Sequence, residues 1–99
     1  MTEVLFKTKA DKELALEALS SAMERELKIL KAKLEGFEKE IQKFESTHKL
    51  SSKEFYEKFE RGELGDDEDH FAWWSAIHAQ KSIQARMETL QELLNQCKQ

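Results

Sequence analysis

The stretch from Met23 to Phe44, MERELKILKAKLEGFEKEIQKF, has the clearest helical pattern in the sequence. Its large apolar residues alternate at spacings of four and three, and they are Met23, Leu27, Leu30, Leu34, Phe37, Ile41 and Phe44. This alternation is the a/d heptad pattern of a coiled-coil seam, sustained here for about three heptads. The pattern predicts one long helix over residues 11–48.

A second seam with the same alternation lies near the C-terminus and predicts a helix over residues 67–97. Its members are Trp73, Ala76, Gln80, Ile83, Met87, Leu90, Leu94 and Cys97. Between the two seams, Ser51 and Glu54 have the spacing of a capping box, and Gly62 suits a helix end. These signals predict a short helix over residues 52–61.

Two long helices joined by a short corner predict an all-α fold, a long antiparallel coiled-coil hairpin with a short helix at the corner. Residues 1–10 are expected to form an N-terminal arm, and residues 11–99 a single helical domain. Several apolar residues lie off the two seams and widen the apolar stripe, namely Leu14, Leu19, Trp74, Ile77 and Leu93. We therefore expect a homodimer, in which a second copy completes a four-helix bundle.

The composition excludes several classes of protein. The 99 residues carry 16 Lys and Arg against 20 Asp and Glu, which argues against a nucleic-acid binder because such proteins need a basic face. One cysteine excludes an internal disulfide framework and suits a reducing compartment. No apolar run approaches the roughly 18 residues of a membrane span, and the N-terminus has no signal-peptide block. We expect a cytoplasmic protein with no membrane partner.

The sequence also lacks the motifs of common catalytic sites, such as GxSxG, a Walker loop, HExxH or CxxC. His48, His70 and His78 have no second histidine or cysteine at ligand spacing, and Asp66 with His70 does not complete a metal site. We expect surface histidines, with His48 at a solvated helix end. The prediction is a non-enzymatic protein with no catalytic residue, no metal and no cofactor.

The segment before the third helix is strongly acidic. Five of its seven residues are acids, namely Glu63, Asp66, Asp67, Glu68 and Asp69. One interpretation is helix capping and compensation of the helix dipole, which favours negative charge in a first turn. The other is an anionic docking surface that steers a basic partner.

Trp73 and Trp74 are adjacent, so their side chains point about 100° apart on a helix and one narrow seam cannot take both. One is expected in the core, where Phe55, Phe59 and Phe71 are also near in sequence, and the other needs a second surface. That surface is the dimer mate, the short helix or a foreign protein, and the last is considered because tryptophan is enriched in binding hot spots. The candidate partner-binding residues are therefore Tyr56, Glu63, Asp66, Asp67, Asp69, Trp73 and Trp74.

Taken whole, the string FYEKFERGELGDDEDHFAWW, Phe55 to Trp74, resembles small helical prokaryotic proteins of the antitoxin-like class. The shared core is an S-x-E-F-Y-x-x-F-x-x-G-E-L-G-D-D-x-D-x-x-x-W-W type pattern, which Ser52 to Trp74 fit. The resemblance implies a cytosolic partner-binding protein encoded beside a toxin that it neutralises. From the acidic run and the double tryptophan we expect the corner to mask a basic partner. The alternative is a structural coiled-coil scaffold with no toxin partner, and a third hypothesis is a DNA-binding autoregulator that uses the N-terminal arm.

Overall fold

The structure is a computed structural model that describes residues 7, 9, 11–65 and 67–98. Most of the expected N-terminal arm and Asp66 therefore lie outside the described residues. The described part of the chain folds into three helices with no strand, which confirms the all-α prediction.

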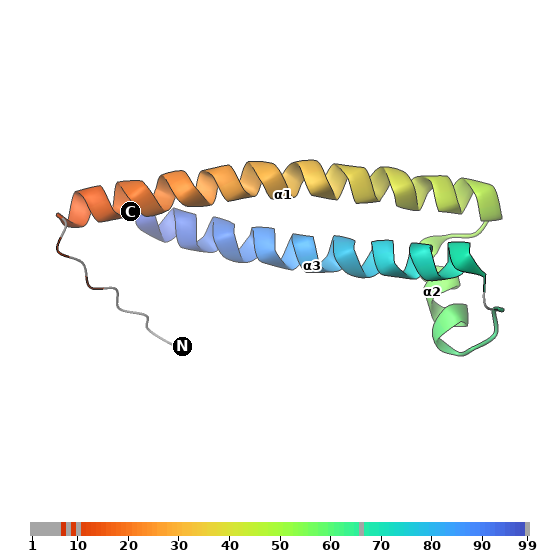
Figure 1. Ribbon diagram of the computed structural model, residues 1–99. Helices are drawn as coiled ribbons and strands as arrows, with labels where there is room; N and C mark the ends of the chain where they lie inside the picture. The colour runs from red at the N-terminus through yellow and green to blue at the C-terminus, as the bar shows by residue number, and fades with distance from the viewer. Residues whose placement is uncertain (1–6, 8, 10, 66, 99) are drawn as a thin grey trace.

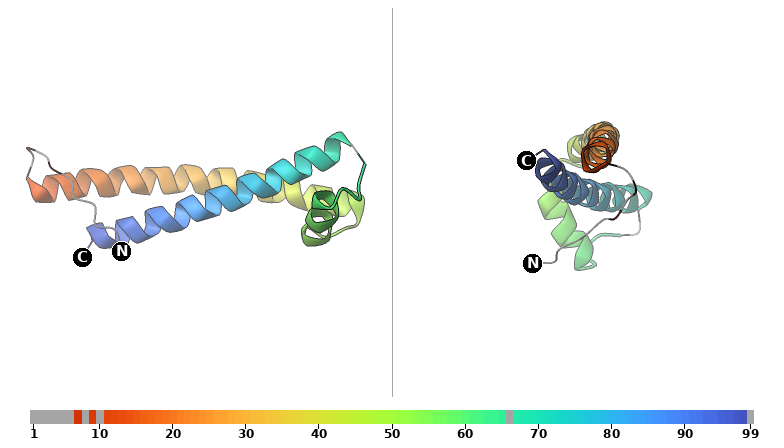
Figure 2. Two further views of the ribbon diagram at one scale, coloured as in Figure 1. Left: turned by 90° about the horizontal axis from the view of Figure 1, so that it is seen from below. Right: turned by 90° about the vertical axis from the view of Figure 1, so that its left-hand side faces the viewer.

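The long helices α1 (Lys12–His48) and α3 (Glu68–Cys97) pack side by side and run antiparallel, and α2 (Ser52–Glu60) lies at the corner between them (Figure 1). The helical hairpin is therefore confirmed. The molecule measures 57 × 27 × 20 Å, with a radius of gyration of 18.9 Å. A compact domain of this length has a radius of gyration of about 13 Å. Figure 2 shows α3 crossing α1 obliquely along this elongated shape.

The predicted start and stop signals lie within one residue of the helix ends. The Ser51 hydroxyl accepts a hydrogen bond of 3.2 Å from the Glu54 N–H, which confirms Ser51 as the cap of α2. Asp11 caps α1 and Asp67 caps α3 in the same way, each accepting from the backbone N–H two residues on. Gly62 follows the end of α2 with φ +70°, a left-handed conformation that glycine adopts without strain.

All members of both predicted seams are buried or half-buried, so the heptad assignment is confirmed. The fully buried apolar residues are fewer, and among the described residues they are Leu30, Ile41, Phe55, Trp73, Ala76, Ile77 and Leu94. Five of these seven form one cluster at the corner end, where α2 adds a third layer to the two-helix seam. No helix in the described part of the chain is long and apolar enough to cross a membrane.

Candidate functional site

The corner contains a stack of rings in its interior. Trp73 and Phe55 have no exposed surface, and their rings are parallel with centroids 4.0 Å apart. The Trp73 indole N–H donates a hydrogen bond of 3.0 Å to the Ser52 hydroxyl, so the polar atom of this buried side chain is satisfied. Phe44 of α1 packs on the same indole, and the two ring centroids are 5.9 Å apart. Trp73 thus joins all three helices and is the tryptophan that fills the core.

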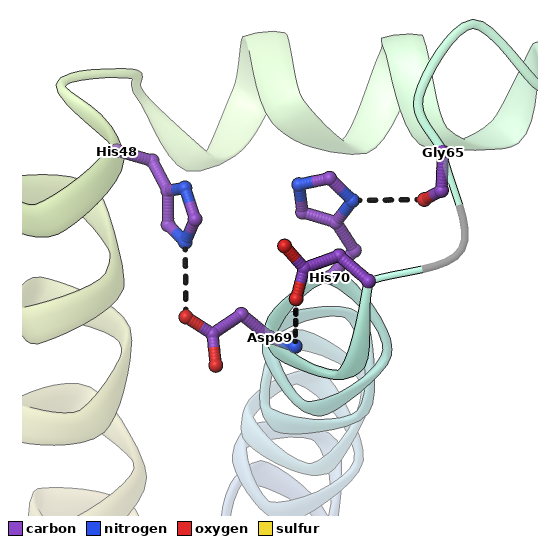
Figure 3. A network of polar contacts seen from close by, with 5 residues as sticks. His48, Gly65, Asp69 and His70 are labelled. Carbon is purple, nitrogen blue, oxygen red and sulfur yellow. Dashed lines mark hydrogen bonds and ion pairs between the residues drawn. The ribbon is translucent and has the colours of Figure 1, made fainter.

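His48 extends this stack, which corrects the expectation of a solvated helix end. Its ring lies 5.5 Å from the Trp73 ring at an interplanar angle of 22°, and its side chain is 24% exposed. The Nε2 atom is shielded from solvent and lies 3.3 Å from an Asp69 carboxylate oxygen (Figure 3). His70 lies alongside, with Nδ1 3.0 Å from the Gly65 carbonyl oxygen. These contacts tie the end of α1 and the loop to the first turn of α3.

A second group of aromatic residues lies on the surface of the corner. Phe59, Phe71 and Trp74 contact one another, with ring centroids separated by 5.9 to 6.3 Å. Phe71 is 64% exposed, the largest exposed fraction among the exposed large apolar side chains of the described residues. We call these three residues the aromatic patch. Phe59 and Trp74 are half-buried against the core and Phe71 is exposed beside them, so the three rings form one partly exposed apolar surface, a feature of protein-binding sites.

Polar residues hold Trp74 and its neighbours in place. The Trp74 indole N–H donates a hydrogen bond of 3.0 Å to a Glu60 carboxylate oxygen, and the His78 ring lies 4.1 Å from the Trp74 ring. The Tyr56 hydroxyl lies 3.2 Å from His78 Nε2, and Lys81 Nζ lies 4.4 Å from the centroid of the Tyr56 ring. These contacts restrict the rotamers that the Trp74 side chain can adopt.

These contacts shift the pKa values of Glu60 and Tyr56. The hydrogen bonds from Trp74 and Tyr56 hold the pKa of the Glu60 carboxyl below its ordinary value of 4.5. Partial desolvation, reinforced by hydrogen bonding and repulsion from Glu60, raises the pKa of the Tyr56 hydroxyl above 10.0. Glu60 is therefore ionised at neutral pH and Tyr56 is neutral, which is the charge arrangement that their hydrogen bonds require.

The acidic residues have structural roles of their own. The Asp67 carboxylate accepts a hydrogen bond of 2.9 Å from the Asp69 N–H, and Asp69 faces His48. Glu63 pairs with Arg61 at 3.4 Å. All three acids remain exposed, so their charges stay available at the surface. Capping thus explains part of the acidic run and does not remove its negative potential.

The structure separates the two candidate tryptophans. Trp73 is buried and Trp74 is half-buried, so Trp74 is the one with exposed surface at the corner. Tyr56 lies on another side of Trp74, in the wall of a groove of about 330 Å³ between α2 and α3. Asp67 precedes Phe71 by one helical turn, and Phe71 precedes Trp74 by another, so acid and rings lie on one side of α3.

Sequence reasoning did not single out Glu60, treated His78 only as a surface histidine, and missed the contact of His48 with Trp73. Glu60 lies four residues after Tyr56 on α2, and His78 lies four residues after Trp74 on α3. That i, i+4 spacing is the available signal, because residues so spaced share a helix face. It does not reveal that the two faces meet.

Within the described residues, no group of three or more His, Cys, Asp or Glu side chains is arranged to hold a metal ion. Comparison of the chain with protein-family models, with curated proteins and with solved structures found no match. The assignment of function therefore depends on the geometry of the corner.

Proposed function

We propose that this chain is a non-enzymatic, antitoxin-like interaction protein of the cytoplasm that masks a basic partner protein with its corner. The observation that carries the proposal is the aromatic patch, with Phe71 64% exposed against Phe59 and Trp74. Covering such rings removes apolar area from water at about 25 cal/mol per Å². A partner that covers them gains affinity from side chains that are already ordered.

The charges beside the patch favour a basic partner. Asp67, Glu68 and Asp69 are exposed at the head of α3, one turn before the patch. Carboxylates attract lysine and arginine side chains during the encounter, and the faces of aromatic rings accept the same cations on contact. A basic surface with apolar pockets therefore matches both features of the corner.

The test is co-expression with the product of the neighbouring gene, followed by tagged purification and mass determination. We expect a stoichiometric complex that Phe71→Ala and Trp74→Ala weaken at least tenfold. Leu14→Ala is the matched control, because Leu14 is 61% exposed and lies far from the corner. Equal binding by the patch variants and the control would contradict the role of the patch.

Electrostatic steering has a separate test. Glu68→Gln removes one charge beside the patch without touching the Asp67 cap, and Glu13→Gln removes a first-turn acid from α1 at the other end. We expect Glu68→Gln to slow association with that partner, more at low salt than at high salt, since salt screens surface charges. An association rate that responds equally to both variants would oppose steering by the corner.

The second candidate function is a structural coiled-coil scaffold. The observation in its favour is that Asp67, Asp69 and Glu63 each have a partner within the chain, so stability alone accounts for them. A scaffold does not need the exposed Phe71. A neighbouring gene product that fails to bind, with self-association intact, would favour this function.

A further inference from the structure

The hairpin has a long side that faces away from α2, and we call it the far face. Its apolar and small residues include Leu19, Ala22 and Ile29 of α1 and Ala79, Ser82 and Leu93 of α3. No part of α2 or of the aromatic patch belongs to it. The far face is therefore independent of the site proposed above.

Helical geometry fixes the position of this face. Ile77 of α3 lines the groove against α2, and Lys98, three heptads later, is on the same side and pairs with Glu24 of α1 at 3.1 Å. Ile29 lies five residues after Glu24, about 140° around α1. Ala79 lies two residues after Ile77, about 160° around α3 by the shorter way. Both therefore point away from the side that α2 occupies.

Three of the five exposed large apolar side chains of the described residues lie on the far face. Ile29 is 50% exposed, Leu93 is 46% exposed and Leu19 is 40% exposed. Between Ala72 and Ser82, the α3 positions on this face are all alanine or serine. Small side chains allow another helix to approach closely, because the distance between packed helices depends on the residues at the contact.

The charges on the same face favour a second copy of this chain as its partner. Glu26 and Glu40 occur there with Lys33, Lys43 and Arg86, so both signs are interspersed. A two-fold axis sets the patch of one copy against the same patch of the other, and a patch that carries both signs allows acids of one copy to lie opposite bases of the other. This contrasts with the acidic corner, which suits a partner of one opposite sign.

The far face is also large enough for a stable dimer interface. The 30 residues of α3 extend about 45 Å, and two helices side by side are about 20 Å wide, which gives roughly 900 Å² per copy. A standard stable interface buries about 800 Å² on each partner. We propose that the far face binds the far face of a second copy, so that two hairpins form a four-helix bundle with both corners free.

The experiment is sedimentation equilibrium of the full chain, with helicity followed by circular dichroism. We expect a mass of twice 11.6 kDa for the natural sequence at micromolar concentration. Ile29→Glu and Leu93→Glu each place a charge in the interface, so the dissociation constant should rise at least tenfold. Leu14→Glu is the matched control and should remain dimeric, because Leu14 is 61% exposed and off this face.

A second variant covers the case in which a glutamate disturbs folding. Ser82→Arg puts a bulky charged side chain, which is also a good helix former, on the exposed small-residue side of α3, and it should yield a helical monomer. A natural chain that stays at 11.6 kDa at 100 μM overturns the proposal. So does a dimer that Leu14→Glu disrupts and Ile29→Glu and Ser82→Arg leave intact.

Discussion

The two ends of the hairpin are held together by different means. At the corner, three helices surround Phe55 and Trp73, whose rings stack 4.0 Å apart with no exposed surface. Towards the free ends, two helices meet along an aliphatic seam, and Leu30 and Leu94 are the described seam residues there that are fully buried. Two helices cover each other on one side only. A third layer is what makes a closed core in this chain.

The same difference separates two kinds of surface. The corner presents aromatic side chains that hydrogen bonds and ring contacts hold in place, which suits specific recognition because little ordering entropy remains to be lost. The open half presents aliphatic and small side chains along straight helices, which suits association with another helical pair.

The largest effect is expected for Trp73→Ala at the corner. The substitution removes the ring that joins all three helices and leaves the Ser52 hydroxyl without its donor, so the free energy of unfolding should fall by about 3–5 kcal/mol. Urea titration at fixed protein concentration measures it. Trp73→Phe, which keeps a ring, should cost less, and equal losses for both variants would oppose the stacking argument.

Leu94→Ala should have a smaller effect at the open end. Leu94 is 4% exposed, yet its neighbours along the seam are half-buried and can relax into the space. We expect a loss of about 2–3 kcal/mol, at the low end of buried leucine truncations, by the same titration. A loss as large as that of Trp73→Ala would remove the distinction between the two ends.

Gly36→Ala should stabilise the open half. A Cβ built at Gly36 meets nothing within 4 Å, so alanine adds helix propensity without a clash, worth about 0.5–1 kcal/mol. Thermal unfolding checks it. Gly62→Ala is the contrasting variant at the corner, because φ +70° strains any residue with a Cβ, and it should lower the stability. Effects of the same sign would contradict this account.

The smallest effect concerns pH and the polar network of the corner. The folded-state pKa of Glu60 lies below its ordinary value, so its ionised form stabilises the fold above about pH 4.5, and this contribution is lost as the pH falls through the folded-state pKa. Glu60→Gln should therefore be less stable than the natural chain at pH 7. The difference should vanish in acid, as followed by urea titration at several pH values.

Much of the architecture follows from local patterns. The alternating spacings give both long helices and their buried sides, and Ser51 with Glu54 gives the start of α2, because capping depends on a few adjacent residues. The heptad pattern also puts Trp73 on the seam and Trp74 off it, and the structure buries Trp73. What does not follow from the pattern is that α2 contacts both, with Phe55 stacked on Trp73 and Phe59 beside Trp74. The same holds for His48, whose partner Trp73 is 25 positions away on another helix.

The site shows the same limit. The acidic run and the double tryptophan are visible in the sequence, and Phe71 is visible as one aromatic residue among several. Its exposure depends on where α2 ends and on how Phe59 and Trp74 fill the space beside it. Contacts between helices decide which side chains outside the seams remain at the surface, and spacing within one helix does not reveal those contacts.

The most direct test of the corner as a recognition surface is calorimetric titration of the neighbouring gene's product into the natural chain and into its Phe71→Ala and Leu14→Ala variants. Our account predicts tight binding by the natural chain and by Leu14→Ala, and a dissociation constant at least tenfold higher for Phe71→Ala. The same affinity for all three chains, or the absence of binding by the natural chain, would contradict it.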